Sequence, residues 1–401
     1  MSTGIELPIA LHAVVAGQIL GAKDSQPTPT ALTVTADGRI EKLHATRPVV
    51  DGAHFDATGC TVLPGFVDVH IHGSAGSDSM DATPEALIAV SRFIASRGVT
   101  AFLATTMTAP PAPTLAAVRN AAAVDPNGLP GARLLGVHLE GPFLSPEFPG
   151  AQPKEYVRDP DLAEFEQLVD AGPVRLITLA PERPGADALI DLARRRGVRV
   201  VMGHTAATYD EAIAAVDQGV DQATHTFNAM TGLHHRKPGV VGATLSDDRV
   251  FAQLIADNIH VHPAVMKVLA RSKGADRTLL ITDAIRAAGL PEGDTELGGQ
   301  RVTVADGACR LPDGTLAGSI LTMDLALRNF IDATGWTLAE TWPVTSRAAA
   351  HALGLDHEIG VLAPGYWTDL VMLDEKLEVV ATVVGGKLVY LRDGEEQRVG
   401  K

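Results

Sequence analysis

Residues 61–73 have the sequence TVLPGFVDVHIHG, in which an apolar run leads directly into two histidines separated by one residue. Side chains at positions i and i+2 of a strand point to the same face of the sheet. We therefore expect His70 and His72 to project side by side from the carboxyl end of a buried strand.

Seven further apolar runs follow, and segments with helical patterning lie between most of them, such as residues 84–97, 113–123 and 209–218. The eight predicted strands are Thr61–Val69, Val99–Thr105, Leu134–Leu139, Arg175–Leu179, Val198–Gly203, Val220–His225, Val250–Ala256 and Thr278–Thr282. Repeated strand–helix units favour a parallel sheet. Eight of them indicate an α/β fold of the closed (β/α)8 TIM-barrel type.

The two ends of the chain have a different pattern, with short β-rich pieces separated by turn signals. These predicted strands are Leu11–Val15, Ala31–Val34, Arg39–Leu43, Leu370–Leu373, Val379–Val384 and Lys387–Leu391. The Gly385-Gly386 pair is typical of a two-residue hairpin turn, and polar residues 23–30 are predicted to form a loop. We expect both ends to pair into one small β-sandwich domain. The predicted division is residues 1–62 and 358–401 for this domain, and 63–357 for the barrel.

Composition excludes several classes of protein. The 401 residues include 33 Lys and Arg against 48 Asp and Glu, a net charge of −15. This charge disfavours a general nucleic-acid or anionic-membrane binder, which needs a basic surface. Two cysteines are too few for a disulfide framework. No apolar run reaches the roughly 18 residues of a membrane span, and the apolar stretch at residues 7–20 lacks the basic start of a signal peptide. We therefore expect a cytoplasmic protein.

Residues that bind metals or transfer protons follow five of the predicted strands. They are His70 and His72, Glu140, His204, His225 and Asp283. The carboxyl ends of the strands are where (β/α)8 enzymes build their active sites. Imidazoles and carboxylates suit zinc, iron or manganese, so we expect one or two divalent ions. A single histidine is more often a hydrogen-bonded structural residue, but this ordered set predicts a hydrolytic metal centre, with Glu140 bound to one ion or bridging two. Asp283 would then exchange protons with the attacking water and the leaving group.

Five short segments give the chain a specific resemblance. They are PGFVD at 64–68, HLEGPF at 138–143, GHT at 203–205, HTFNAM at 225–230 and GTLAGS at 314–319. With them, essentially the whole chain resembles the N-acetylglucosamine-6-phosphate deacetylase family of the amidohydrolase superfamily. The resemblance implies a metal-dependent hydrolase that converts N-acetyl-D-glucosamine 6-phosphate to D-glucosamine 6-phosphate and acetate.

The resemblance also implies a role for each matching residue. Glu140, His204 and His225 correspond to the main metal ligands, His70 and His72 to a second metal position, and Asp283 to the catalytic carboxylate beside the metal. His260 corresponds to a histidine that holds the acetyl carbonyl. The implied substrate contacts are Ala151 and Gln152, Asn228 and Ala229, Arg236, and the closing loop Leu316, Ala317 and Gly318. Arg236 corresponds to a phosphate-binding arginine. Because such an arginine can reach the neighbouring subunit's site, a homodimer is implied.

Residues 150–152 depart from the family pattern, and other functions stay open. The chain has Gly-Ala-Gln where the family usually has Gly-Ala-His, and Gln152 cannot carry a proton at neutral pH. This leaves deacetylation of N-acetylgalactosamine 6-phosphate as an alternative, and an N-acyl amino acid amidohydrolase as another. A non-catalytic metal-containing scaffold is a third alternative, disfavoured because all six candidate metal and proton-transfer residues are present.

Overall fold

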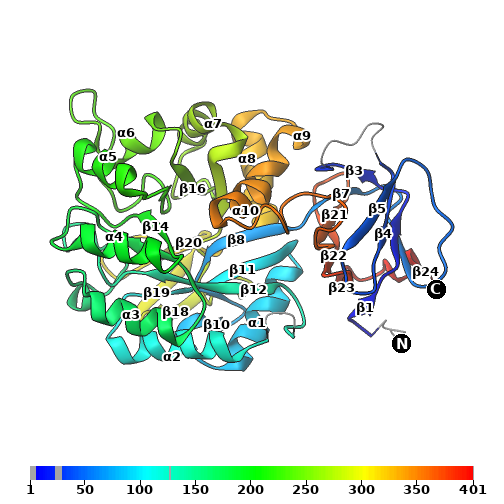
Figure 1. Ribbon diagram of the computed structural model, residues 1–401, viewed down its shortest axis with the longest axis horizontal. Helices are drawn as coiled ribbons and strands as arrows, with labels where there is room; N and C mark the ends of the chain where they lie inside the picture. The colour runs from blue at the N-terminus through cyan, green and yellow to red at the C-terminus, as the bar shows by residue number, and fades with distance from the viewer. Residues whose placement is uncertain (1–5, 23–28, 126–127, 401) are drawn as a thin grey trace.

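The computed structural model describes residues 6–22, 29–125 and 128–400. A large unit of alternating strands and helices lies beside a smaller unit made of strands, turns and a single turn of 3-10 helix at Glu396–Arg398 (Figure 1). The smaller unit contains the first and last described strands, β1 and β24, so the two ends of the chain lie in the same part of the molecule. The predicted loop at residues 23–30 lies mostly outside the described residues.

Eight parallel strands form the large unit and follow one another in chain order around the sheet. They are β8 (Phe66–Ile71), β11 (Val99–Thr106), β12 (Arg133–Glu140), β13 (Val174–Leu179), β14 (Arg199–Met202), β15 (Gln222–Ala223), β16 (Phe251–Ile255) and β17 (Thr278–Ile281). The first and last strands meet: Asp283 N donates to His70 O at 2.9 Å, and His72 N donates to Ala284 O at 2.9 Å. The predicted α/β barrel is confirmed.

Helices cover the outside of this barrel and bury their apolar faces against the strands. The principal helices are α1 (Pro84–Ala95), α2 (Pro111–Ala123), α3 (Leu162–Ala171), α4 (Ala186–Arg195), α5 (Tyr209–Gln218), α6 (Gly239–Ser246), α7 (Pro263–Arg277), α8 (Met323–Thr334), α9 (Leu338–Thr341) and α10 (Arg347–Leu353). Local sequence explains where they begin. Thr208 and Glu211 form a reciprocal capping box at the start of α5, which satisfies backbone N–H groups that the helix leaves free. On α1, Leu87, Val90 and Ile94 recur at helical spacing and are buried.

The first predicted strand, residues 61–69, is in fact two strands. β7 (Thr61–Pro64) pairs with β3 and β21 in the small unit, whereas β8 belongs to the barrel. Gly65 separates them: a Cβ atom there would lie 2.1 Å from Cγ2 of Thr100, so only glycine fits this close approach. The predicted domain boundary after residue 62 falls inside β7. We therefore propose to keep the division into two domains and to place this boundary at Gly65.

Two sheets pack face to face in the small unit. One has the order β1 (Ile9–Ala10), β23 (Lys387–Leu391), β22 (Val379–Val384), β21 (Leu370–Leu373), β7 and β3 (Gln18–Ile19). The other has the order β24 (Val399–Gly400), β6 (His54–Asp56), β2 (Ala13–Val15), β4 (Ala31–Val34) and β5 (Ile40–His44). Phe55 of the second sheet and Met372 of the first belong to one buried apolar cluster. The β-sandwich expected from both chain ends is therefore present.

An additional antiparallel sheet, which the sequence reasoning did not predict, follows β17. Its strands are β18 (Gly293–Leu297), β19 (Gln300–Ala305) and β20 (Ala308–Arg310). Its buried side, including Val302 and Cys309, packs with Met107 from the end of β11. Exposed and buried residues alternate along β19, which is the period-two signal of a half-buried strand. Within the described residues, no helix is long and apolar enough to cross a membrane.

Candidate active site

A cavity of about 440 Å³ opens at the carboxyl ends of the barrel strands. Its lining combines the strand ends with two loops, residues 147–152 and 314–318, and with Leu297 and Arg310 of the additional sheet. His72, Glu140, His204, His225 and Asp283 all line it, while His70 is fully buried. The barrel therefore brings together the six residues that the sequence singled out, although up to 213 positions separate them in the chain (283 − 70).

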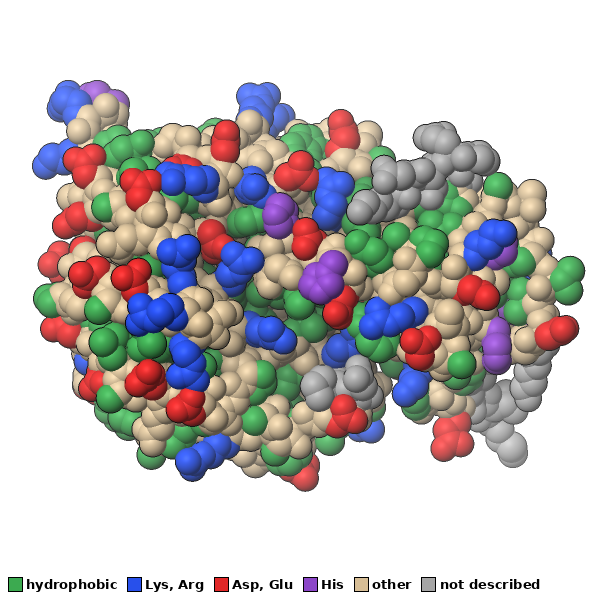
Figure 2. All heavy atoms as spheres, in the orientation of Figure 1, with side chains coloured by type: hydrophobic (Ala, Val, Ile, Leu, Met, Phe, Trp, Pro, Cys, Tyr) green, Lys and Arg blue, Asp and Glu red, His purple; other side chains and the backbone are tan. Residues whose placement is uncertain are grey.

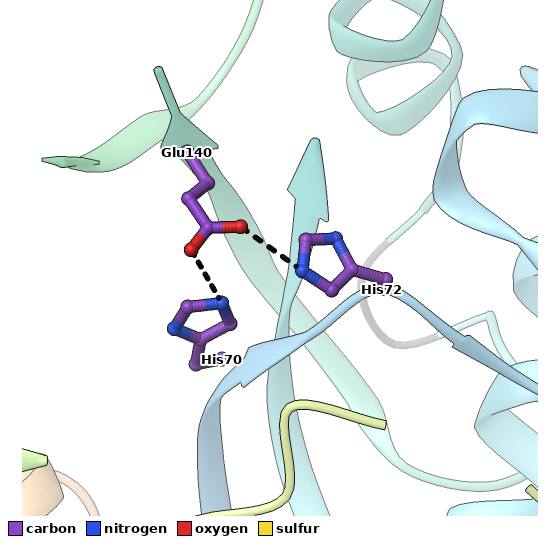
Figure 3. A group of neighbouring side chains, drawn as sticks. All are labelled: His70, His72 and Glu140. Atoms are coloured by element: carbon purple, nitrogen blue, oxygen red, sulfur yellow. Dashed lines mark ion pairs between the residues drawn. The ribbon is translucent and has the colours of Figure 1, made fainter. Parts of the chain in front are cut away.

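Glu140 lies at the centre of this cluster. Its Oε1 is 3.1 Å from Nε2 of His204, 3.2 Å from Nε2 of His225 and 3.4 Å from Nε2 of His70. Its Oε2 is 3.1 Å from Nε2 of His72. Figure 3 shows His70 on β8 and His72 just after this strand, both pointing toward the two carboxylate oxygens of Glu140 at the end of β12. One carboxylate thus links four imidazoles.

The geometry of the cluster fits divalent metal ions. Two overlapping sets, His70–His72–Glu140 and Glu140–His204–His225, each have ligand atoms within 4.8 Å of one another. His204 donates Nδ1–H to the carbonyl of Phe148, an oxygen that only accepts, which leaves a lone pair on Nε2. That atom lies 3.0 Å from Nε2 of His225, and Nε2 of His70 has no hydrogen-bond partner among the described residues. A buried imidazole nitrogen without a partner, beside a carboxylate that other imidazoles share, is suited to bind a cation.

The carboxylates and the imidazoles of the cluster shift one another's pKa values. Burial raises the pKa of Glu140, but His70, His204 and His225 outweigh burial and hold that pKa well below its usual value. Burial lowers the pKa of His72, but Asp283 and Glu140 outweigh burial and raise it well above its usual value. In the absence of an ion, protonated imidazoles therefore compensate the buried carboxylates. A divalent ion held by these residues would replace those protons as the source of positive charge.

Asp283 lies beside two of the candidate metal ligands. Its Oδ1 lies 3.2 Å from Nε2 of His72 and 3.5 Å from Nε2 of His70. Burial raises the pKa of Asp283, but His70 and His72 outweigh burial and lower it, so the carboxylate is ionised. Asp283 has a φ of 49°, and His204 and His225 also have positive φ values of 48° and 27°. Unusual backbone geometry of this kind in residues other than glycine gathers at functional sites.

The predicted substrate-contacting residues fall into two groups. Those that line the cavity are Ala151, Gln152, Asn228, Ala229, His260, Leu316 and Gly318. Ala317 is buried beneath the same loop. Arg236 does not line the cavity: it lies in the exposed segment 232–237 before α6. That segment projects beside α6 in Figure 1, and basic and histidine side chains gather at the same place in Figure 2.

Gln152 contacts the metal-ligand cluster itself. Its Nε2 donates to Oε2 of Glu140 at 2.6 Å, and its Oε1 accepts from the backbone N–H of Thr108 at 2.7 Å. The side chain is buried and is held at both ends of its amide. Gln152 therefore supplies a neutral donor to Glu140, a role that a histidine in the same place could share.

The structure also adds residues that the sequence reasoning missed. Arg310 is the only lysine or arginine among the described residues that line the cavity. Asp257 holds His260: its Oδ2 lies 2.6 Å from Nδ1 of His260, and its Oδ1 accepts the backbone N–H groups of Ile259 and His260. An Asp three residues before a candidate histidine was the available signal for Asp257. No comparable signal exists for Arg310, because its place at the cavity depends on the additional sheet.

Comparisons with known proteins agree with this geometry. Residues 61–389 match the sequence model described as the amidohydrolase family. An N-acetylgalactosamine-6-phosphate deacetylase from Escherichia coli O157:H7 is 43% identical, over 82% of this chain and 87% of that protein. An N-acetylglucosamine-6-phosphate deacetylase from Lysinibacillus sphaericus is 41% identical, over 88% of this chain and 91% of that protein.

Solved structures are similar over nearly the whole chain. The N-acetylglucosamine-6-phosphate deacetylase from Thermotoga maritima has a TM-score of 0.86 and 36% identity, covering 95% of this chain and 100% of that one. A variant of the Mycobacterium smegmatis deacetylase, in complex with N-acetyl-D-glucosamine-6-phosphate, has a TM-score of 0.88 and 34% identity, covering 95% and 99%. With the family match spanning most of the chain and a shared glutamate among four histidines at the barrel mouth, the chain belongs to the amidohydrolase family.

Proposed function

We propose that the protein hydrolyses the N-acetyl group of N-acetyl-D-glucosamine 6-phosphate, releasing D-glucosamine 6-phosphate and acetate. The observation that carries this proposal is the cavity with Asp283 beside two overlapping His/Glu ligand sets. Seven of the nine residues that the resemblance assigns to the substrate line the same cavity, the exceptions being Arg236 and Ala317. Seven of the eight relatives that we compared are named as N-acetylglucosamine-6-phosphate deacetylases.

The chemistry divides between the metal centre and the chain. Divalent ions held by Glu140 with His204 and His225, and by Glu140 with His70 and His72, would polarise the amide carbonyl and activate water. Asp283 accepts a proton from the attacking water at its carboxylate and passes it to the leaving nitrogen. Water thus supplies the new oxygen of acetate, and the nitrogen departs as an amine. His260, held by Asp257, is assigned to the acetyl carbonyl oxygen.

The function is tested by acetate release from a matched set of compounds. Metal-reconstituted protein is given N-acetylglucosamine 6-phosphate, its unphosphorylated form, its galactosamine epimer and an N-acyl amino acid. We expect kcat/KM for the first to exceed the others by roughly ten-fold or more, which corresponds to about 1.4 kcal/mol of transition-state discrimination. Indifference to the phosphate, or no acetate from any compound, contradicts the proposal.

The galactosamine epimer is the second candidate, because the Escherichia coli relative at 43% identity is named for that substrate. The two sugars differ only at one hydroxyl, and Gln152 occupies the loop where the family pattern departs. A preference for N-acetylgalactosamine 6-phosphate would keep the metal chemistry and replace the substrate.

Arg310 is expected to bind the phosphate. A phosphate dianion in a protein of net charge −15 needs a local cation, and Arg310 is the guanidinium at the cavity. Replacing Arg310 with alanine should raise KM for the phosphorylated sugar about ten-fold, as for the loss of one charge-assisted hydrogen bond, and leave the unphosphorylated sugar unaffected. Steady-state kinetics on both sugars measure this ratio.

Arg301→Ala is the matched control, because Arg301 lies on the same sheet and its side chain is 69% exposed and paired with Asp294. Equal effects of R310A and R301A would contradict a phosphate role for Arg310.

Arg236→Ala tests the proposed homodimer: the exposed 232–237 segment can alter the phosphate dependence only from a neighbouring subunit, since it does not line its own cavity. The two cysteines are free and buried, in keeping with the proposed cytoplasmic location.

A further inference from the structure

A chain of hydrogen bonds crosses the interior of the barrel and ends on a metal ligand. Nδ1 of His70 lies 3.3 Å from Oε1 of Gln253. Nε2 of Gln253 donates to Oε1 of Gln222 at 3.2 Å, and Nε2 of Gln222 donates to the carbonyl oxygen of Ala352 at 3.3 Å. His70, Gln222 and Gln253 are all fully buried. The chain therefore connects α10 to the cluster through β15, β16 and β8.

Only one direction of donation is possible along this chain. The Ala352 carbonyl can only accept, so Gln222 must present its NH₂ group there and its oxygen toward Gln253. Gln253 must then donate to that oxygen and present its own oxygen to His70. The ring nitrogen facing Gln253 must consequently be Nδ1–H. In the neutral imidazole this leaves the lone pair on Nε2, the atom that faces Glu140 and Asp283.

His70 differs in this respect from the other imidazoles of the cluster. Nδ1 of His204 is held by a backbone carbonyl. Nδ1 of His72 and of His225 have no hydrogen-bond partner within the described part of the chain. Among the four imidazoles around Glu140, only His70 has its Nδ1 held by a side chain, that of Gln253. This hydrogen bond can therefore be removed by substituting Gln253, which is not itself a candidate metal ligand.

We propose that Gln253, backed by Gln222, is a positioning residue that fixes the tautomer of His70 and thereby sets the metal affinity of the His70–His72–Glu140 position. The amide of Gln253 also donates to the amide oxygen of Gln222 in the buried interior of the barrel, where an unpaired amide is costly. A purely structural role would end there. The proposed role extends to the ion, because the hydrogen bond made by one ring nitrogen decides what the other nitrogen can bind. It rests on the metal centre and not on the identity of the substrate.

The test compares Gln253→Met, Gln222→Met and the double variant by titration of the chelated protein with Zn²⁺, without substrate. His72→Ala identifies which of the two binding steps belongs to the His70–His72–Glu140 position. We expect Q253M to weaken that step about 10- to 100-fold, the usual effect of removing the partner of a metal-bound histidine, and to leave the other step unchanged. Q222M should have a smaller effect, and the double variant should be no weaker than Q253M.

A spectroscopic readout accompanies the titration. Long-range ¹H–¹⁵N spectra of the chelated, zinc-free protein, recorded at alkaline pH where the imidazoles are neutral, report which ring nitrogen of each histidine carries a proton, and His70→Asn assigns the His70 signals. The native protein should show Nδ1–H at His70, and Q253M should lose that single tautomer. Gln300→Met is the matched control, since Gln300 also donates to a backbone carbonyl, that of Ala151 at 2.7 Å, without touching a ligand. It should leave both metal steps and the His70 signals as in the native protein.

Gln253→Glu keeps the proposal testable if Q253M folds poorly. A carboxylate still accepts from Nδ1–H, so Q253E should retain the His70 tautomer and the metal affinity. It should lower the melting temperature, because the carboxylate has no N–H to donate to Oε1 of Gln222. The proposal is overturned if Q253M binds zinc natively, if it weakens both steps equally, or if the losses in the double variant multiply. Failure of acetate release would overturn the proposed function and leave these binding results intact.

Discussion

Replacing Asp283 with asparagine is expected to lower kcat about 10³-fold, within the range for loss of a general acid–base group, while the bound metal remains. The amide has nearly the shape of the carboxylate but cannot accept the proton of water. Asparagine also tolerates a left-handed backbone, which matters because Asp283 has a φ of 49°. Metal content and single-turnover acetate release on the same preparation measure both parts.

Asp306→Asn is the matched control for this result. Asp306 is an exposed aspartate with a φ of 50° in the turn between β19 and β20, so the substitution repeats the backbone demand without removing a group from the cavity. It should retain native kcat. Near-native activity of D283N would show that Asp283 is not the proton acceptor, whereas loss of the ion in D283N would show that Asp283 acts chiefly as a ligand.

Replacing Glu140 with glutamine is expected to remove both metal positions at once. Glu140 belongs to both ligand sets, and it is the carboxylate whose charge the surrounding imidazoles face. His72→Ala, which alters one set, should lose one ion and keep the other. Metal content after dialysis distinguishes these outcomes, and activity of E140Q should fall at least about as far as that of D283N. Retention of one tightly bound ion by E140Q would contradict the shared role of Glu140.

Metal uptake by the chelated protein should release protons. In the ion-free cluster the pKa of His72 is raised well above its usual value, because Asp283 and Glu140 outweigh burial. The pKa of His70 is raised as well, since Glu140 and Asp283 outweigh its burial. An ion requires the neutral rings, so affinity must fall as pH is lowered. Calorimetry in buffers of different ionisation enthalpy counts the protons, and uptake without proton release would show that the rings are already neutral.

Much of the barrel and the cluster could be predicted from the sequence because both depend on local patterns. The strand β15 is only two residues long, yet the motif that begins at His225 marks the end of that barrel strand. The predicted bounds of α5, β4, β21, β22 and β23 agree with the observed elements. The error at residues 61–69 arose because β7 and β8 form one continuous apolar run. Only the pairing partners show that it serves two sheets.

The proposed phosphate contact could not be predicted from the sequence in the same way. Arg236 lies in a basic run whose sequence favours phosphate binding, but in the structure it lies in an exposed segment outside the cavity. Arg310 has no distinctive neighbours in the sequence and comes to the cavity with the additional sheet. The position of a loop or an insertion relative to a barrel depends on packing between distant segments, which local periodicity does not encode.

The sequence alone was enough to place two histidines, a glutamate, two more histidines and an aspartate at strand ends, because side chains alternate along a strand and parallel strands end at one edge. The tertiary structure decided how those residues meet. It joins Gln152 to Glu140 and Gln253 to His70, pairs that lie 12 and 183 positions apart. Such hydrogen bonds depend on barrel closure and on angstrom-scale approach of side chains, and neither leaves a mark in the order of residues.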